Sequence, residues 1–153
     1  MCGVAGILDF KNNVPLKGNK IYRALKLINH RGPDDLHYTN IDSFFYAGAV
    51  RLSIEALNYG KQPIKDNRYS IGFNGEIFNY KELASKYKIS KKLFNSEIQF
   101  LLEAWKLKGN NMFKDFEGQF VIFIYDSHKK ELVIARDPFG IRPLFFISKI
   151  GRA

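Results

Sequence analysis

The chain has 153 residues, of which 46% are hydrophobic and 15% aromatic, so it has the size and composition of one domain with a core of its own. Its formal net charge of +9 keeps a basic nucleic-acid-binding domain open as an alternative. We expect one cytoplasmic domain over residues 1–153, because the sequence lacks a membrane-helix stretch and a signal peptide, and its single cysteine excludes a disulfide framework.

The N-terminal part of the chain is typical of a strand followed by a helix. Residues 3–10 form a nearly continuous apolar run, which predicts a buried strand that begins almost at the terminus. Apolar residues from Ile21 to Ile28 fall on one helical face, so we expect a helix that ends before the HRGPD loop at residues 30–34.

Two strands and two helices are predicted in the middle of the chain. Residues 43–54 and 69–78 are rich in aromatic and β-branched residues and contain glycines, which indicates strands with bends. Asn79 and Ser96 each stand three residues before a Glu or Gln, the capping-box spacing of a helix start. The apolar face predicted for the second helix consists of Ile98, Leu101, Leu102 and Trp105.

The last part of the chain returns to β structure. Residues 119–126 and 131–137 are apolar runs joined by the SHKK turn, which predicts a hairpin. Residues 136–143 indicate a turn-rich loop, and residues 143–148 a further strand. Strands, then two helices, then strands predict two packed sheets with helices on their outer sides, an α+β layered sandwich.

Cys2 is the first candidate for chemistry. A lone cysteine is ordinarily a small buried hydrophobe, but removal of Met1 makes Cys2 the N-terminal residue. One residue then carries a thiol nucleophile and an α-amine with a pKa of about 7.7 to 8.0, which suits a general base. A separate histidine is not needed. His30, His37 and His128 also show no spacing with Cys2 that indicates a metal site.

Eight segments in a fixed order resemble the glutaminase domains of asparagine synthetases, which are class II glutamine amidotransferases. The segments are MCGVAGILDF, HRGPD, RLSI, QPI, FNGEIFNY, SEIQFLLEAW, FEGQFVIFIYD and ARDPFGIRPLFF, and together they cover most of the chain. The resemblance implies the four-layer αββα sandwich of N-terminal nucleophile hydrolases. It also implies that Cys2 attacks the side-chain amide of glutamine, forms a glutamyl thioester and releases ammonia.

Asn74 and Gly75 have two interpretations. Asn-Gly between apolar strands is the strongest short hairpin signal, so the pair alone predicts a tight turn. The resemblance instead assigns both residues to the oxyanion hole, where a side-chain NH₂ and a backbone N–H point at the oxygen that becomes negative. A turn is one way in which the backbone N–H is presented.

The resemblance also implies the residues that bind glutamine. Arg51 is assigned to the α-carboxylate, which its planar guanidinium matches with two parallel bonds. Glu76 and Glu97 are assigned to the α-ammonium. Glu97 departs from the family, which has aspartate there, and the alternative is a helix N-terminal charge stabilised by the helix dipole. The residues assigned to the lining of the pocket are Leu52, Ser53 and Ile54.

The sequence also bears on cofactors, partners and alternative functions. The sequence contains no Gly-rich phosphate loop, so ATP and magnesium are expected only in a synthetase domain that residues 1–153 do not include, and no cofactor is expected here. The implied partners are glutamine and an ATP-dependent synthetase domain or subunit that uses the ammonia, for example in asparagine synthesis. Departures at Leu36, Ala56 and Glu97 leave a non-catalytic regulatory or interaction module as the alternative. Only the charge favours nucleic acid, and no membrane partner is expected.

Overall fold

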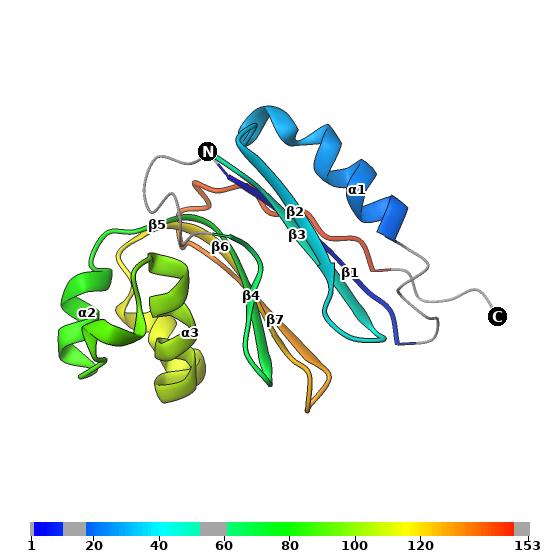
Figure 1. Cartoon of the computed structure of the whole chain (residues 1–153). Helices are drawn as coiled ribbons and strands as arrows, with labels where there is room; N and C mark the ends of the chain where they lie inside the picture. The colour runs from blue at the N-terminus through cyan, green and yellow to red at the C-terminus, as the bar shows by residue number, and fades with distance from the viewer. Residues whose placement is uncertain (1, 11–17, 53–60, 149–153) are drawn as a thin grey trace.

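A computed structural model describes residues 2–10, 18–52 and 61–148, which form two antiparallel sheets flanked by helices (Figure 1). The first sheet has the strand order β1-β3-β2 and the second β4-β5-β6-β7. The strands are β1 (Gly3–Leu8), β2 (Asp35–Asn40), β3 (Phe45–Arg51), β4 (Ile64–Lys65), β5 (Tyr69–Ile77), β6 (Gly118–Asp126) and β7 (Glu131–Arg136). The helices are α1 (Gly18–Leu27), α2 (Tyr80–Lys86) and α3 (Glu97–Lys108), with short 3₁₀ helices η2 (Asn29–Arg31), η3 (Lys91–Leu93) and η4 (Gly109–Asp115).

The first sheet is covered on its outer side by α1. Ile21 and Leu25 of α1 are buried against Val50 of β3, the central strand. Full burial of one such side chain stabilises the fold by about 1.5 to 3 kcal/mol. The helix ends at Leu27, so the prediction of a helix that ends before the HRGPD loop is confirmed.

The second sheet packs its outer face on α2 and α3. Phe73 and Ile77 of β5 share a buried cluster with Ile98 of α3. The predicted apolar face of α3 is partly wrong, because Phe100 and Ala104 are fully buried whereas Leu102 and Trp105 are only half-buried. Since α3 contacts α2 as well as β5, it buries a wider face than its apolar stripe alone indicates.

Aromatic side chains join the inner faces of the two sheets. Phe45 of β3 lies 4.7 Å from Tyr125 and 5.6 Å from Phe123 of β6, measured between ring centroids. Asp42 accepts hydrogen bonds from the Tyr125 hydroxyl at 2.8 Å and the Lys130 ammonium at 2.9 Å, which links a loop of the first sheet to the β6–β7 hairpin. The prediction of an α+β fold is confirmed.

The strand predictions have mixed outcomes. The hairpin formed by β6 and β7 is confirmed, with Asp126 paired to Glu131 across its turn. Strand β2 was not predicted, because its polar residues hide the pattern. The strand predicted over residues 143–148 is wrong: Phe145 and Phe146 are 90% and 78% exposed, and no described strand pairs with the segment. Apolar composition does not make a strand without a partner.

The capping boxes are also wrong, although both helices begin where predicted. The Asn79 side chain makes no cap bond; its amide instead donates to the Asp115 carbonyl at 2.9 Å and accepts the Glu117 N–H at 3.1 Å. The Gln99 side chain accepts the N–H of Asn95 at 2.7 Å, and the residue before α3 makes no side-chain cap bond. Tertiary contacts have replaced the local ones.

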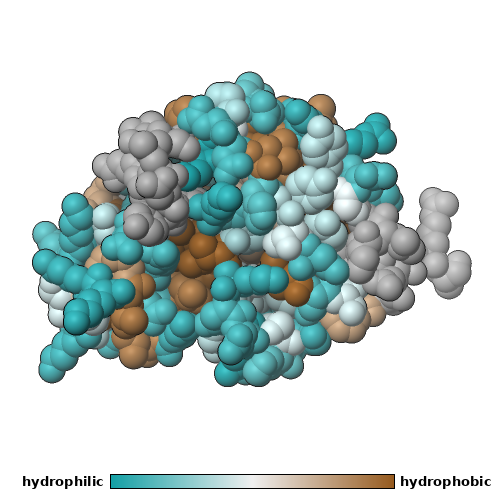
Figure 2. All heavy atoms as spheres, viewed as in Figure 1, coloured by the Kyte–Doolittle hydropathy of each residue, from teal (hydrophilic) through white to brown (hydrophobic). Residues whose placement is uncertain are grey.

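The basic residues of the densest lysine stretch lie on the protein surface. The lysines of the densest basic stretch, Lys86, Lys88, Lys91 and Lys92, are all exposed to solvent. Hydrophilic residues cover most of the face shown in Figure 2. Both observations favour the interpretation of a solvated face. None of the described helices is long and apolar enough to cross a membrane.

Candidate active site

Cys2 lies immediately before β1, at the end of the first sheet. Gly3 pairs with Val50, so the same register brings Cys2 opposite Arg51 of β3. The cysteine is half-buried, and its Sγ lies 4.0 Å from the carbonyl oxygen of Leu52. The Arg31 Nε donates to the carbonyl oxygen of Cys2 at 3.3 Å. The side chain of the predicted nucleophile therefore lies beside Leu52, and Arg31 holds its backbone carbonyl.

Arg51 is the last residue of β3 and is buried. Its carbonyl oxygen accepts the N–H of Asp34 at 3.1 Å, which fixes the HRGPD loop beside it. Leu52 follows and is half-buried. The remaining predicted pocket residues, Ser53 and Ile54, lie outside the described residues, as does Ala56. Arg51 and Leu52 thus share one end of the first sheet with Cys2.

Asn74 and Gly75 lie within β5, so the prediction that they form a tight turn is wrong. Asn74 pairs with Val121 and Gly75 with Phe120 of β6. Gly75 has a φ of 149°, and a Cβ at this position would stand 2.7 Å from the Phe120 Cα and closer still to the Gln119 carbonyl oxygen. Glycine is required here by backbone conformation and by the close neighbouring strand.

Backbone amides of β5 alternate between its two edges. Phe120 uses both its N–H and its carbonyl on Asp137, on the side away from β5, so Gly75 and Phe120 form a pair without mutual hydrogen bonds. The N–H of Gly75 therefore points away from β6. The same holds for Phe73 and Ile77, which stand two residues to either side.

Side-chain oxygens accept hydrogen bonds from two of these three N–H groups. Gln62 Oε1 accepts the N–H of Phe73 at 2.7 Å, and Glu97 Oε1 accepts the N–H of Ile77 at 2.7 Å. Strand β4 cannot do so, since it pairs with β5 only as far as Ile71. The N–H of Gly75 lies between the two and has no acceptor among the described residues. This N–H is therefore available to donate a hydrogen bond to a ligand.

The Asn74 side chain lies on the inner face of the second sheet. Residues directly opposite each other share a face, and Phe123 and Tyr125, two and four residues along from Val121, pack against the first sheet. Asn74 thus faces the first sheet, whose strand β1 contacts β5. Its side chain is 5% exposed, and its Oδ1 has no hydrogen-bond partner among the described residues. A buried amide that does not serve the fold suits a binding role.

The two predicted acidic residues meet the same stretch of β5. Glu76 follows Gly75 and is exposed. Glu97 is the first residue of α3, as the helix-terminus alternative requires, but its carboxylate also holds Ile77 of β5. The structure therefore gives Glu97 a tertiary role that neither interpretation of the sequence included.

Asp137 supports the strand behind the site. Its carboxylate accepts N–H groups from Phe120, Ile141 and Arg142 at 3.2, 2.9 and 3.1 Å. Burial alone would raise the pKa of Asp137, but these three hydrogen bonds hold it below its usual range. The carboxylate therefore stays charged and ties the loop after β7 to β6, directly behind Gly75.

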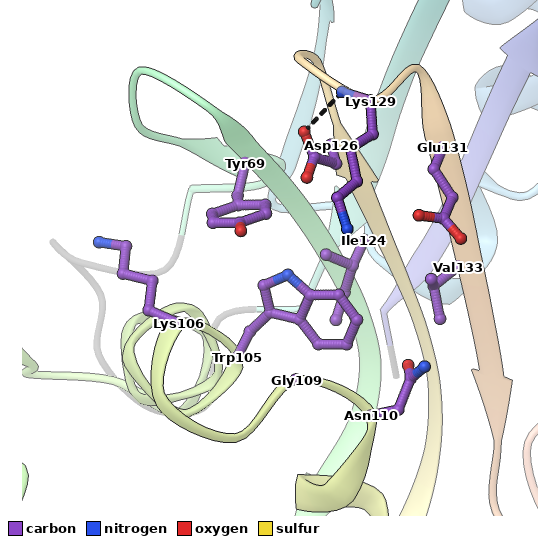
Figure 3. A pocket seen from close by; sticks show the side chains of 10 residues that line it. All are labelled: Tyr69, Trp105, Lys106, Gly109, Asn110, Ile124, Asp126, Lys129, Glu131 and Val133. Atoms are coloured by element: carbon purple, nitrogen blue, oxygen red, sulfur yellow. Dashed lines mark hydrogen bonds between the residues drawn. The ribbon is translucent and has the colours of Figure 1, made fainter.

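A cavity of 370 Å³ lies elsewhere, on the helix-covered side of the second sheet (Figure 3). Trp105 and Tyr69 lie side by side along one part of the cavity, and Lys129 and Glu131 also line it. None of the predicted site residues that the structure describes lines it, so it is separate from the candidate site. Within the same described ranges, no group of His, Cys, Asp or Glu side chains is placed to hold a metal ion.

The chain is similar to known proteins over most of its length. The family model of the glutamine amidotransferase domain matches residues 1–153. The chain belongs to this family. Curated relatives include asparagine synthetase [glutamine-hydrolyzing] 2 of Bacillus subtilis, 36% identical over 152 residues, and asparagine synthetase B of Escherichia coli, 32% identical over 148 residues. Asparagine synthetase [glutamine-hydrolyzing] 2 of Arabidopsis thaliana is 30% identical over 150 residues.

The matches cover 95% of this glutamine amidotransferase domain but only 20%, 26% and 25% of the three relatives. The chain thus spans between a fifth and about a quarter of their length. The sequence alone did not reveal the roles of Gln62 and Asp137, although each lies in one of the eight segments of the resemblance. Arg31, interpreted from the sequence as a loop anchor, holds the carbonyl of Cys2. A polar residue that stays buried inside such a segment is the signal that would have identified Gln62 and Asp137.

Proposed function

We propose that this glutamine amidotransferase domain hydrolyses the side-chain amide of glutamine to glutamate and ammonia, with Cys2 as nucleophile. The observation that carries the proposal is the N–H of Gly75, left open between two amides that side chains have filled. Beside it, the buried Asn74 amide faces the first sheet, in which Cys2 lies immediately before β1. Two such donors on the side of the nucleophile support an oxyanion hole formed by Asn74 and Gly75.

The reaction then needs no group beyond these residues and water. The α-amine of Cys2 takes the proton of Sγ, and the thiolate attacks the amide carbon of glutamine. The carbonyl oxygen becomes negative and receives hydrogen bonds from the Asn74 side chain and the Gly75 N–H. When the C–N bond breaks, the α-ammonium gives its proton to the departing amide nitrogen, which leaves as ammonia. Water, deprotonated by the same amine, hydrolyses the glutamyl thioester and frees Cys2.

Binding of glutamine is assigned to the ends of β3, β5 and α3. The Arg51 guanidinium would hold the α-carboxylate, beside Leu52 and with Ser53 and Ile54 as further pocket residues. Glu76 and Glu97 would hold the α-ammonium. The position of Arg51 opposite Cys2 in the β1–β3 register supports this assignment, because it sets carboxylate binding at the end of the sheet where the nucleophile lies.

The proposal includes a fold type and a partner. The layers of helix, sheet, sheet and helix support the αββα sandwich of N-terminal nucleophile hydrolases, formed as one domain over residues 1–153 (Figure 1). The names of the relatives support an ATP-dependent synthetase domain or subunit as partner, where ATP and magnesium would bind and ammonia would be used for asparagine synthesis.

A glutamine analogue with an electrophile at its side-chain carbon tests the proposal. The analogue should modify Cys2, the one cysteine of the sequence, and excess glutamine should slow the modification. Cys2→Ala should fold normally and remain unmodified. Glutamine that binds the wild type while the analogue leaves Cys2 untouched would instead favour a regulatory module.

A further inference from the structure

We propose that Gln62 is a positioning residue that keeps the Gly75 N–H directed at the oxyanion. It does so by accepting a hydrogen bond from the neighbouring Phe73 N–H of β5 and by connecting that strand to the first sheet. The inference rests on the proposed function, and it assigns to Gln62 no contact with glutamine. Gln62 would act on the geometry of the oxyanion hole, which Asn74 and Gly75 do not fix by themselves.

The edge of β5 needs such a residue. Strand β4 is only two residues long, and its pairing with β5 covers Ser70 and Ile71. Beyond Ile71 the outward amides of β5 would lie on an open edge, which is free to bind water or to shift. Gln62 Oε1 fills the first of them, that of Phe73, at 2.7 Å. The next outward amide is that of Gly75.

Gln62 is itself fixed to the first sheet. Its carbonyl oxygen lies 3.0 Å from Nδ1 of His37, a residue of β2. Because a carbonyl only accepts, Nδ1 carries the proton and donates. Gln62 is 8% exposed, so solvent offers little competition for either bond. One residue thus connects β2 of the first sheet with β5 of the second.

This connection sets the relative position of nucleophile and oxyanion donor. Cys2 belongs to the first sheet through the β1–β3 register, and Gly75 belongs to the second. Reaction between groups held on separate elements depends on their spacing, and a displacement of about 1 Å can cost about 100-fold in rate. Without the acceptor of Gln62, the Phe73 N–H would be buried and unsatisfied, and β5 would move to find a partner.

Variants of Gln62 test the proposal in the full chain, together with a matched control. Gln62→Met removes the acceptor with little change of volume, whereas Gln62→Glu keeps an oxygen in place. The control is Asp66→Ala, because Asp66 Oδ1 fills the Tyr69 N–H at 2.7 Å on the same edge of β5, far from Gly75. Steady-state kinetics of glutamate release would be measured for each, together with amide hydrogen exchange and backbone amide chemical shifts by NMR.

We expect Gln62→Met to lower kcat by about tenfold or more with the KM for glutamine within about threefold, and Gln62→Glu to restore most of kcat. Amide exchange should quicken at Phe73 in Gln62→Met, and the backbone amide chemical shift of Gly75 should move as the strand moves. Asp66→Ala should quicken exchange at Tyr69 and leave both kcat and the Gly75 chemical shift unchanged. Unchanged kcat and an unchanged Gly75 chemical shift in Gln62→Met would overturn the proposal.

The two proposals fail in different ways. A folded wild type that releases no glutamate contradicts the proposed function, whatever Gln62 does. The NMR measurement still decides the role of Gln62 in that case, since an unchanged amide chemical shift of Gly75 in Gln62→Met shows that Gln62 does not hold the strand. Conversely, an active wild type with a fully active Gln62→Met contradicts only the positioning role.

Discussion

Glu97 Oε1 accepts the backbone N–H of Ile77 at 2.7 Å, which joins the first residue of α3 to β5 just beyond Gly75. The carboxylate at the start of the helix therefore also holds the strand that carries the proposed oxyanion donor. The finding changes how variants of Glu97 should be read.

Glu97→Gln separates charge from strand support. Glutamine keeps an oxygen for the Ile77 N–H, so stability should change by only about 0.3 to 1 kcal/mol, the value of a helix-terminus charge. A lost contact with the α-ammonium should lower kcat/KM by about 10- to 150-fold, chiefly through KM. Glu97→Ala, which loses both functions, should also lose stability. If Glu97→Gln binds glutamine as the wild type does, Glu76 holds the ammonium without it.

Asn74→Ala should lower kcat by about 100- to 1,000-fold, the loss typical of one oxyanion donor. Since Asn74 Oδ1 has no partner among the described residues, the melting temperature should remain close to that of the wild type. Asn40→Ala is the matched control, because Asn40 Oδ1 is also buried without a hydrogen-bond partner among the described residues. Asn40 lies at one end of β2, whereas Asp35, which pairs with Arg51, lies at the other. Equal kinetics for the two variants would exclude Asn74 from the oxyanion hole.

Gly75→Ala should destabilise the domain by about 3 kcal/mol or more, because a methyl group has no room beside β6 and the φ of 149° disfavours it. Gly109→Ala offers the comparison. Gly109 has a φ of 52°, but no atom lies within 4 Å of an added Cβ, so we expect a cost of about 1 to 2 kcal/mol. Urea denaturation would measure both, and equal losses would contradict the steric argument.

Asp126 makes stability depend on acid pH. Burial alone would raise the pKa of Asp126, but the Arg68 guanidinium at 2.7 Å and the N–H groups of His128 and Lys129 lower it to about 2. A lowered pKa stabilises the folded state above about pH 4, and the gain is lost as pH falls toward 2. Asp126→Asn should therefore cost about 2 kcal/mol at pH 7 and far less near pH 2. A gap in unfolding free energy that stays constant with pH would contradict this.

The sequence was sufficient for elements whose pattern is local. The apolar runs gave β1, β6 and β7, and the helical stripe from Ile21 gave α1. It failed where tertiary contacts decide. Asn79 and Gln99 have the spacing of capping residues but bind other backbone groups, and β2 forms from polar residues because β3 offers it an edge.

The candidate site shows the same division. Residue types and order pointed to Cys2, Arg51 and Asn74, because a nucleophile, a carboxylate partner and an amide are recognisable by their chemistry. The state of each backbone amide was not predictable, since it depends on Gln62 and Glu97, which reach β5 from elsewhere in the chain. The Asn-Gly signal was misleading for this reason, as it describes a turn and not a strand in a sheet.

Glutamate release by two forms of the same chain tests the N-terminal nucleophile most directly. One form begins at Cys2 and the other retains Met1, and mass spectrometry confirms which is present. We expect release by the form that begins at Cys2 and only background release by the other, because a peptide bond removes the basic lone pair of the amine. Equal rates from both forms, or no release from the form that begins at Cys2, would contradict it.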